Sequence, residues 1–206
     1  HDLFFKFCER QKINIPIISE EMPGIENKRL NLPTFVIDPI DGTKGLVDGT
    51  GEWSISIAYI EGMNFVGKNI GAIYHPPSDQ LYDLKSSFNF REVQQKIRVY
   101  VSRTEFNQGL YKDLESSKDY DVTPMGSIAL KLAKLYAGEC DLVITRKPKN
   151  LWDIAAGIAL LASSPDRFFI SQNGKVFNSF TSDLTYSAPM IFGIKKVEKR
   201  ALALAQ

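Results

Sequence analysis

A short apolar strand that runs directly into two aspartates constrains this chain more than any other feature. Residues 34–37 have the β-branched and aromatic side chains of a buried strand, and the run Asp38–Thr43 (DPIDGT) follows at once. Carboxylates three residues apart on a tight turn can point at one spot and hold a hard cation such as Mg²⁺. A lone Asp-x-x-Asp is nevertheless more typical of a turn or a helix cap. The motif therefore predicts a metal site only if other acids join it.

Two further acidic positions stand beside predicted elements. Glu20 follows the apolar run 15–18, and Asp153 opens an alanine-rich helix predicted over 151–162. Because ligands in α/β proteins gather beyond the ends of strands, Glu20 can join the aspartate pair, and Glu21 beside it is an alternative. Taken singly, each of these acids is more typical of a solvated surface or of a helix N-terminus.

Gly42 and Thr43 add an element that favours anions. A glycine lets a ligand approach the backbone closely, and free N–H groups at the start of a helix favour phosphate. Acidic side chains beside such a turn would repel a phosphate unless a metal ion lay between them. The combination indicates a phosphate bridged to the protein by metal.

Apolar periodicity and turn residues predict the remaining elements. We predict helices over 2–11, 106–116, 127–137 and 151–162. We predict strands over 15–18, 34–37, 53–60, 66–74, 80–84, 99–101, 141–145, 168–170 and 176–177.

The pattern divides the chain near its midpoint. Residues 1–97 form an α+β half that carries most of the metal-binding acids, and residues 98–206 form an α/β half. Segments 85–96 and 163–165 join their neighbours abruptly, as if loops were absent from the numbering. The range 22–33 is polar, contains proline and glycine, and is expected to be a loop.

Composition narrows the function classes. The chain is 44% hydrophobic, and its 25 Lys and Arg against 24 Asp and Glu give a net charge of +1, which argues against a nucleic-acid binder. No apolar run approaches the ~20 residues of a membrane span. Cys8 and Cys140 are expected to be buried, reduced thiols of a cytoplasmic protein. A homodimer is compatible with the sequence.

Three ordered motifs resemble those of the inositol monophosphatase superfamily. They are Ser19-Glu20-Glu21, the run Asp38–Thr43, and Trp152–Gly157 (WDIAAG), and the resemblance covers nearly the whole chain. It implies a layered α/β/α/β/α sugar-phosphatase fold. It also implies a metal-dependent phosphoric monoester hydrolase with two or three Mg²⁺ ions and a small phosphorylated substrate.

The resemblance assigns metal ligands residue by residue. Asp38 is expected to bridge two metals, and the main-chain carbonyl of Ile40 to bind one of them. Asp41 and Asp153 are expected to complete the second site. Glu20 is expected to bind the first metal and to help hold a water.

The resemblance also assigns catalytic and phosphate-binding residues. Glu20, Asp41 and Thr43 are the implied catalytic residues, with the Thr43 hydroxyl helping to activate the attacking water, and Gly42 and Thr43 cradle the phosphate. The family's Thr-x-x-Asp element has no counterpart before Glu20, and we expect it in a segment upstream of residue 1. Without such a segment, the chain would be a catalytically impaired regulatory protein that binds metal and phosphate.

Within the superfamily, the chain is most similar to the 3'(2'),5'-bisphosphate nucleotidases, which act on adenosine 3',5'-bisphosphate. The similarity rests on Lys44 after the motif threonine, on Gly51-Glu52 and on Val101-Ser102-Arg103. The expected substrate contacts are Gly42, Thr43, Lys44, Ser102, Arg103, Ser127, Lys131 and Asp153.

Two features leave the pocket open. The run 126–131 has the spacing of inositol monophosphatases, so inositol phosphate is the alternative substrate. Arg146, Lys147 and Lys149 can line the leaving-group pocket or form an exposed basic loop. Trp152 is expected to pack in the core.

Overall fold

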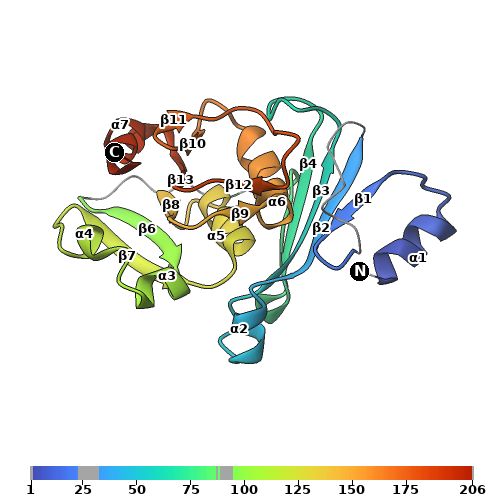
Figure 1. The fold of residues 1–206 in the computed structure, drawn as a ribbon, viewed down its shortest axis with the longest axis horizontal. Coiled ribbons are helices and arrows are strands. Elements are labelled where there is room, and N and C mark those ends of the chain that lie inside the picture. The colour runs from blue at the N-terminus through green and yellow to red at the C-terminus, as the bar shows by residue number, and fades with distance from the viewer. Residues whose placement is uncertain (1, 23–32, 87, 89–94, 206) are drawn as a thin grey trace.

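The computed structural model of the chain describes residues 2–22, 33–86, 88 and 95–205, and its elements stack in the alternating helix and sheet layers that were expected (Figure 1). The first sheet has five strands in the order β1-β2-β3-β4-β5. They are β1 (Ile17–Ser19), β2 (Thr34–Asp41), β3 (Ser54–Ile60), β4 (Ile70–His75) and β5 (Gln80–Tyr82). Because β1 is parallel to β2, both strands direct their carboxyl ends to the same edge.

The second sheet has six strands in the order β11-β10-β13-β8-β6-β7. They are β6 (Ile97–Ser102), β7 (Tyr120–Met125), β8 (Leu142–Thr145), β10 (Phe168–Gln172), β11 (Lys175–Val176) and β13 (Met190–Ile194). Strand β6 is parallel to both β7 and β8, so these three strands end at one edge. A small antiparallel ribbon joins β9 (Lys149–Asn150) to β12 (Thr185–Tyr186).

Helices fill the space between the sheets and cover their outer faces (Figure 1). The helices are α1 (Asp2–Arg10), α2 (Thr43–Val47), α3 (Arg103–Asn107), α4 (Lys112–Glu115), α5 (Ile128–Tyr136), α6 (Leu151–Ala162) and α7 (Glu198–Leu202). Helices α5 and α6 lie between the two sheets, and α1 packs on the outer face of the first. Helices α3, α4 and α7 lie on the outer side of the second sheet, which completes the α/β/α/β/α order.

One hydrophobic core connects the two halves of the chain. It contains Val36 and Ile73 from the first sheet, Leu132 and Ile158 from the central helices, and Phe192 from the second sheet. The first sheet ends at Tyr82 and the second begins at Ile97, but the two sheets share this core. Burial of α5 and α6 therefore fixes the position of one sheet relative to the other.

The helix predicted over 106–116 was wrong in its extent. Helix α3 ends at Asn107 and α4 begins at Lys112, because Gly109 between them adopts a φ of +73°, which a continuing helix does not allow. The strand predicted from residue 66 begins at Ile70. The side chain of Asn69 accepts a hydrogen bond from the Glu61 N–H and donates to the Asn64 carbonyl, closing a loop before the strand.

Strands β7, β9, β12 and β13 were not predicted. Strand β7 lies at a sheet edge and contains Pro124, whereas β13 is an apolar run with little alternation. Most of 22–33 and of 85–96 lies outside the described residues. Segment 163–165 is a hydrogen-bonded turn, in which the Arg167 N–H donates to the Ser164 carbonyl.

Two further observations concern the chain as a whole. Cys8 and Cys140 are both buried and free, as expected. In the described part of the chain, no helix has both the length and the apolar character that crossing a bilayer requires.

The contact between α6 and the first sheet depends on a glycine in β4. A Cβ added at Gly71 would overlap the backbone carbonyl of Ala156 in α6. We therefore expect Gly71→Ala to lower the free energy of unfolding by about 1–3 kcal/mol in chemical denaturation, because backbone has to shift. Gly62→Ala is the control, because nothing lies within 4 Å of its Cβ position. Equal stability of the two variants would contradict this packing.

Candidate active site

A bulge at the end of β2 turns two aspartates to the same side of the sheet. Asp38 pairs with Ser56 and Asp41 pairs with Ser54, so three steps along β2 match two along β3. In a regular strand, residues three apart point to opposite faces. The extra residue places both carboxylates on one side, where each is at least nine-tenths buried.

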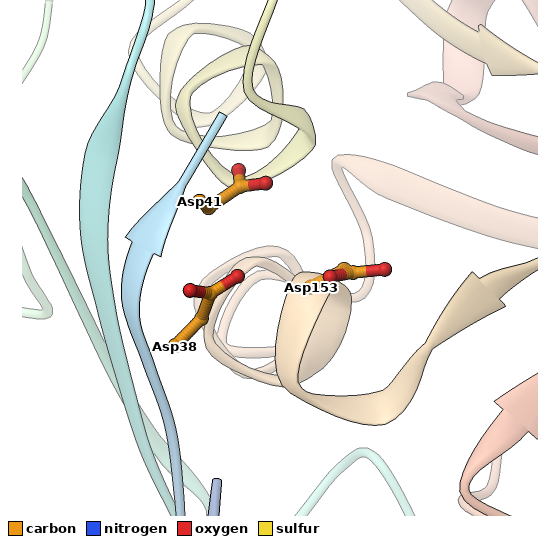
Figure 2. A group of neighbouring side chains, drawn as sticks. All are labelled: Asp38, Asp41 and Asp153. Atoms are coloured by element: carbon orange, nitrogen blue, oxygen red, sulfur yellow. The ribbon is translucent and has the colours of Figure 1, made fainter. Parts of the chain in front are cut away.

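Asp153 of α6 joins this pair from the central helix layer. One carboxylate oxygen from each of Asp38, Asp41 and Asp153 lies within 4.8 Å of the others, and Figure 2 shows the three side chains converging from β2 and from the first turn of α6. The structure thus brings together acids that are more than 100 positions apart in the sequence. We call this group the aspartate cluster.

Backbone donors fix each member of the aspartate cluster through one oxygen. Asp38 Oδ1 accepts from the Ile40 N–H (3.0 Å), and Asp153 Oδ2 accepts from the Asn150 N–H (2.8 Å) in a capping box. Asp41 Oδ2 accepts from the Ser127 hydroxyl (2.5 Å) and the Ala129 N–H (2.6 Å) at the start of α5. These aspartates therefore do have the cap and turn roles that are typical of their residue type. Those roles orient the second carboxylate oxygen of each aspartate.

Burial and mutual repulsion make the aspartate cluster costly to ionise. Burial, with the charges of Asp41 and Asp153, raises the pKa of Asp38 to about 8. Burial and the charge of Asp41 raise the pKa of Asp153 to about 7. Burial also raises the pKa of Asp41, although Ser127 and Ala129 oppose the shift. A divalent cation would relieve this repulsion, and the all-oxygen donor set suits a hard one.

Glu20 lies beside the aspartate cluster rather than inside it. It is exposed after β1, and burial together with the charges of Glu21 and Asp41 raises its pKa. The charge of Glu20 also raises the pKa of Asp38. Of the two acids that the sequence left open, Glu20 is thus the one whose charge reaches Asp38.

The turn after Asp41 has the predicted glycine geometry. Gly42 adopts a φ of +88° as the N-cap of α2, and a Cβ there would meet the Glu52 carbonyl and the Ser127 nitrogen. Thr43 is exposed, and its hydroxyl donates to the Ile40 carbonyl (3.2 Å). The turn therefore places a half-buried glycine and an exposed threonine at the end of β2, next to the aspartate cluster.

A cavity of about 200 Å³ opens beside the aspartate cluster and carries charges of both signs. Asp41 and Asp153 belong to its lining. The lining also includes Gly42, Lys44, Ser102, Arg103, Ser127 and Lys131 from the predicted substrate contacts. It forms where β2, β6, β7 and β8 end, which is the edge where ligands of α/β proteins bind.

The predicted cations of the cavity differ in their remaining hydrogen-bonding capacity. The guanidinium of Arg103 pairs with the Glu52 carboxylate and also donates to the Pro124 carbonyl (2.7 Å). Lys131 is 2% exposed, and its ammonium donates to the carbonyls of Met125, Gly126 and Ser127. Burial lowers the pKa of Lys131 to about 8.

The basic loop before Asp153 divides between the two expected roles. Lys149 lines the cavity, whereas Arg146 pairs with Asp113 and lies over the Tyr111 ring at 5.1 Å. Lys147 is exposed. Trp152 is 9% exposed within the main core, as expected.

Sequence reasoning missed Glu105. The spacing from Ser102 to Glu105 is that of a capping box, and the Glu105 N–H does donate to the Ser102 hydroxyl (3.4 Å). The Glu105 carboxylate, however, is 1% exposed and binds the end of β8 instead. A glutamate in the first turn of a helix gives no sign of partners 40 residues away.

Comparisons with known proteins agree on one family. The Inositol monophosphatase family matches residues 2–164. A 3'(2'),5'-bisphosphate nucleotidase CysQ of Escherichia coli O6:H1 is 30% identical over 164 residues, which are 73% of this chain and 65% of the relative. A fructose-1,6-bisphosphatase/inositol-1-monophosphatase of Thermotoga maritima is 29% identical over 186 residues, which are 85% of this chain and 69% of the relative. The chain thus spans about two thirds of the length of the nucleotidases that it matches.

A solved structure has the same fold. The IMPase of Thermotoga maritima aligns with a TM-score of 0.75 at 22% identity, and the alignment covers 99% of this chain and 79% of that one. The layered arrangement of this chain is therefore that of a known phosphatase fold.

The aspartate cluster predicts how metal and pH act together on stability. Asp38 and Asp153 bind protons more tightly when folded, so their contribution to the free energy of unfolding is full below the ordinary aspartate pKa of 3.8 and is lost as pH rises through about 7 to 8. We expect Mg²⁺ to raise the melting temperature much more at about pH 8 than at about pH 5, where protons already neutralise the cluster. Calorimetric melting curves with and without Mg²⁺ measure this.

Asp38→Asn distinguishes Mg²⁺ binding at the aspartate cluster from general effects of ions on stability. It removes one buried charge while keeping an oxygen for the Ile40 N–H. We expect the metal-free variant to melt above the unsubstituted chain at about pH 8 and to gain little from Mg²⁺. Asp166→Asn is the control, because Asp166 is exposed. A Mg²⁺ shift that Asp38→Asn leaves intact would contradict this assignment.

Proposed function

Because the chain belongs to the inositol monophosphatase family, we propose that it is a Mg²⁺-dependent phosphomonoesterase that removes the 3'-phosphate of adenosine 3',5'-bisphosphate. One observation carries this proposal: the aspartate cluster stands at a cavity whose lining also carries lysine and arginine. Acids alone would repel a phosphate ester, and cations alone would not hold a metal. Both together suit a metal-bound phosphate with a second anionic group.

The residues present fit Mg²⁺, which prefers oxygen donors. Asp38, Asp41 and Asp153 would hold it, with Glu20 and the Ile40 carbonyl as further ligands in the proposal. When bound, Mg²⁺ lowers the pKa of water and neutralises charge that develops on phosphate oxygens.

The chain's own groups would orient the phosphate and the attacking water. No side chain among the described residues caps the backbone at Gly42 and Thr43, and Thr43 is exposed, so the N–H groups there can bind phosphate oxygens. The Thr43 hydroxyl donates to the Ile40 carbonyl, so its oxygen can accept a hydrogen bond from a water and orient that water at the same place. Ser127 keeps Asp41 in position through its short hydrogen bond. These groups act by positioning, which is the main protein contribution in phosphoryl transfer.

Substrate choice is the finer part of the proposal. The nucleotidase relatives and the cations of the cavity support a substrate with two phosphates. The Thermotoga maritima relative, named for fructose bisphosphate and inositol monophosphate, supports keeping inositol phosphate as the alternative.

A substrate panel decides between these alternatives. We expect Mg²⁺-dependent phosphate release from adenosine 3',5'-bisphosphate with a kcat/KM at least about tenfold above that for inositol 1-phosphate, because only the former places a second phosphate among the cations. Phosphate is measured colorimetrically at matched Mg²⁺. The reverse order would move the assignment to inositol phosphate, and Mg²⁺ binding without any turnover would favour a regulatory protein.

Asp41→Asn tests the metal centre as the source of activity. The variant keeps an oxygen for the Ala129 N–H, so the fold should persist, while the lost ligand charge should lower kcat at least about 100-fold. Circular dichroism checks the fold, and Asp166→Asn serves as the matched surface control. Unchanged turnover in Asp41→Asn would contradict the proposed function.

A further inference from the structure

Glu105 is a buried carboxylate that the proposed chemistry does not use. Its Oε2 accepts from the Tyr111 hydroxyl (2.5 Å) and the Arg146 N–H (2.8 Å). Its Oε1 accepts from the Thr145 hydroxyl (3.1 Å) and the Lys149 ammonium (3.4 Å). A carboxylate that is 1% exposed is costly unless its lone pairs are occupied, and here both oxygens are.

The contacts of Glu105 keep it ionised. Burial by itself would raise its pKa, but the hydrogen bonds from Tyr111, Arg146 and Thr145, with the charge of Lys149, lower it. Glu105 therefore presents a fixed negative charge to Lys149. Glu105 belongs to α3 and Lys149 belongs to β9. This ion pair therefore links two elements at the strand edge where the cavity lies.

Lys149 extends from this anchor to the cavity. Its side chain is 18% exposed and belongs to the cavity lining together with Asp41 and Asp153. Its positive charge opposes the rise in the pKa of both aspartates, so the ammonium lies within electrostatic reach of the aspartate cluster. The β9 strand that carries it leads directly into α6, the helix of Asp153.

Lys149 also retains N–H donors for a ligand, whereas Lys131 and Arg103 already use theirs within the protein. An ammonium has three N–H donors, and those of Lys131 are directed to three backbone carbonyls. Arg103 is neutralised by Glu52. Among the described residues, the Lys149 ammonium makes one long hydrogen bond, to Glu105, which restrains the side chain while leaving donors for a ligand.

We propose that Lys149, held by Glu105, binds the phosphate of the substrate that is not hydrolysed. Lys149 then determines specificity for bisphosphates, and Glu105 is a positioning residue. The inference rests on the proposed function, in which the other phosphate lies at the aspartate cluster. This positioning role explains why a carboxylate is fully buried at the edge of the site, where a neutral side chain would have a smaller desolvation free energy.

Binding of AMP tests the inference without turnover at the 3' position. AMP keeps the 5'-phosphate that Lys149 is proposed to bind and lacks the one to be removed. In calorimetry with Mg²⁺, we expect Lys149→Gln to weaken AMP binding about tenfold or more and Lys149→Arg to retain most of it. Lys147→Gln, on the same loop and exposed, should bind like the unsubstituted chain. Equal AMP affinity in Lys149→Gln would overturn the inference.

Kinetics separate this inference from the proposed function. For Lys149→Gln, we expect kcat/KM on adenosine 3',5'-bisphosphate to fall about tenfold more than kcat/KM on 3'-AMP, because only the former carries the phosphate that Lys149 is proposed to bind. Equal losses on both substrates would overturn the inference while the proposed function stands. Lys149-dependent AMP binding without hydrolysis of either substrate would keep the inference and reject the proposed function. Absence of both binding and hydrolysis would overturn both.

Glu105→Gln tests the positioning role. We expect a raised KM for adenosine 3',5'-bisphosphate and weakened AMP binding, with a several-fold smaller effect on 3'-AMP hydrolysis, because the Lys149 ammonium loses its charged anchor. Thermal melting of each variant checks the fold. A loss of stability with equal losses on both substrates would show that Glu105 has a structural role only.

Discussion

Repulsion among two buried carboxylates and a half-buried one is the constraint on which this structure depends. Oxygens of Asp38, Asp41 and Asp153 lie within 4.8 Å of one another, in surroundings that raise the pKa of each. Folding brings them together because each carboxylate also binds a backbone N–H that would otherwise lack a partner. The structural role fixes one oxygen and leaves the other for a cation. The same arrangement therefore prepares the site for a cation and destabilises the fold until a cation binds.

The site assembles only when the layers dock. The bulge in β2 directs Asp38 and Asp41 toward the central helices, where Asp41 caps α5 and Asp153 belongs to the first turn of α6. Other cavity residues come from the ends of β6, β7 and β8 in the second sheet. The shared core therefore positions metal ligands and substrate contacts together. Opposite charges meet at this junction, which suits a ligand that is itself anionic and metal-bound.

Local chemistry made part of this predictable from sequence. Gly138 ends α5 with a φ of +79°, and Asn173 and Gly174 form the tight turn between β10 and β11, as their residue types indicate. The layered fold and the family followed from ordered motifs. The bulge was not predictable, because register depends on the pairing with β3. The carbonyl partners of Lys131 and the role of Glu105 were also not predictable, since they depend on how helices pack on strand ends.

Manganese, which scatters anomalously and favours the same oxygen ligands as Mg²⁺, offers the most direct test of the central claim. Crystals of this chain grown with Mn²⁺ should give an anomalous difference peak enclosed by the free oxygens of Asp38, Asp41 and Asp153. We expect that peak in the unsubstituted chain and its loss in Asp38→Asn. A well-ordered aspartate cluster without a peak, in crystals that show Mn²⁺ bound elsewhere, would contradict it.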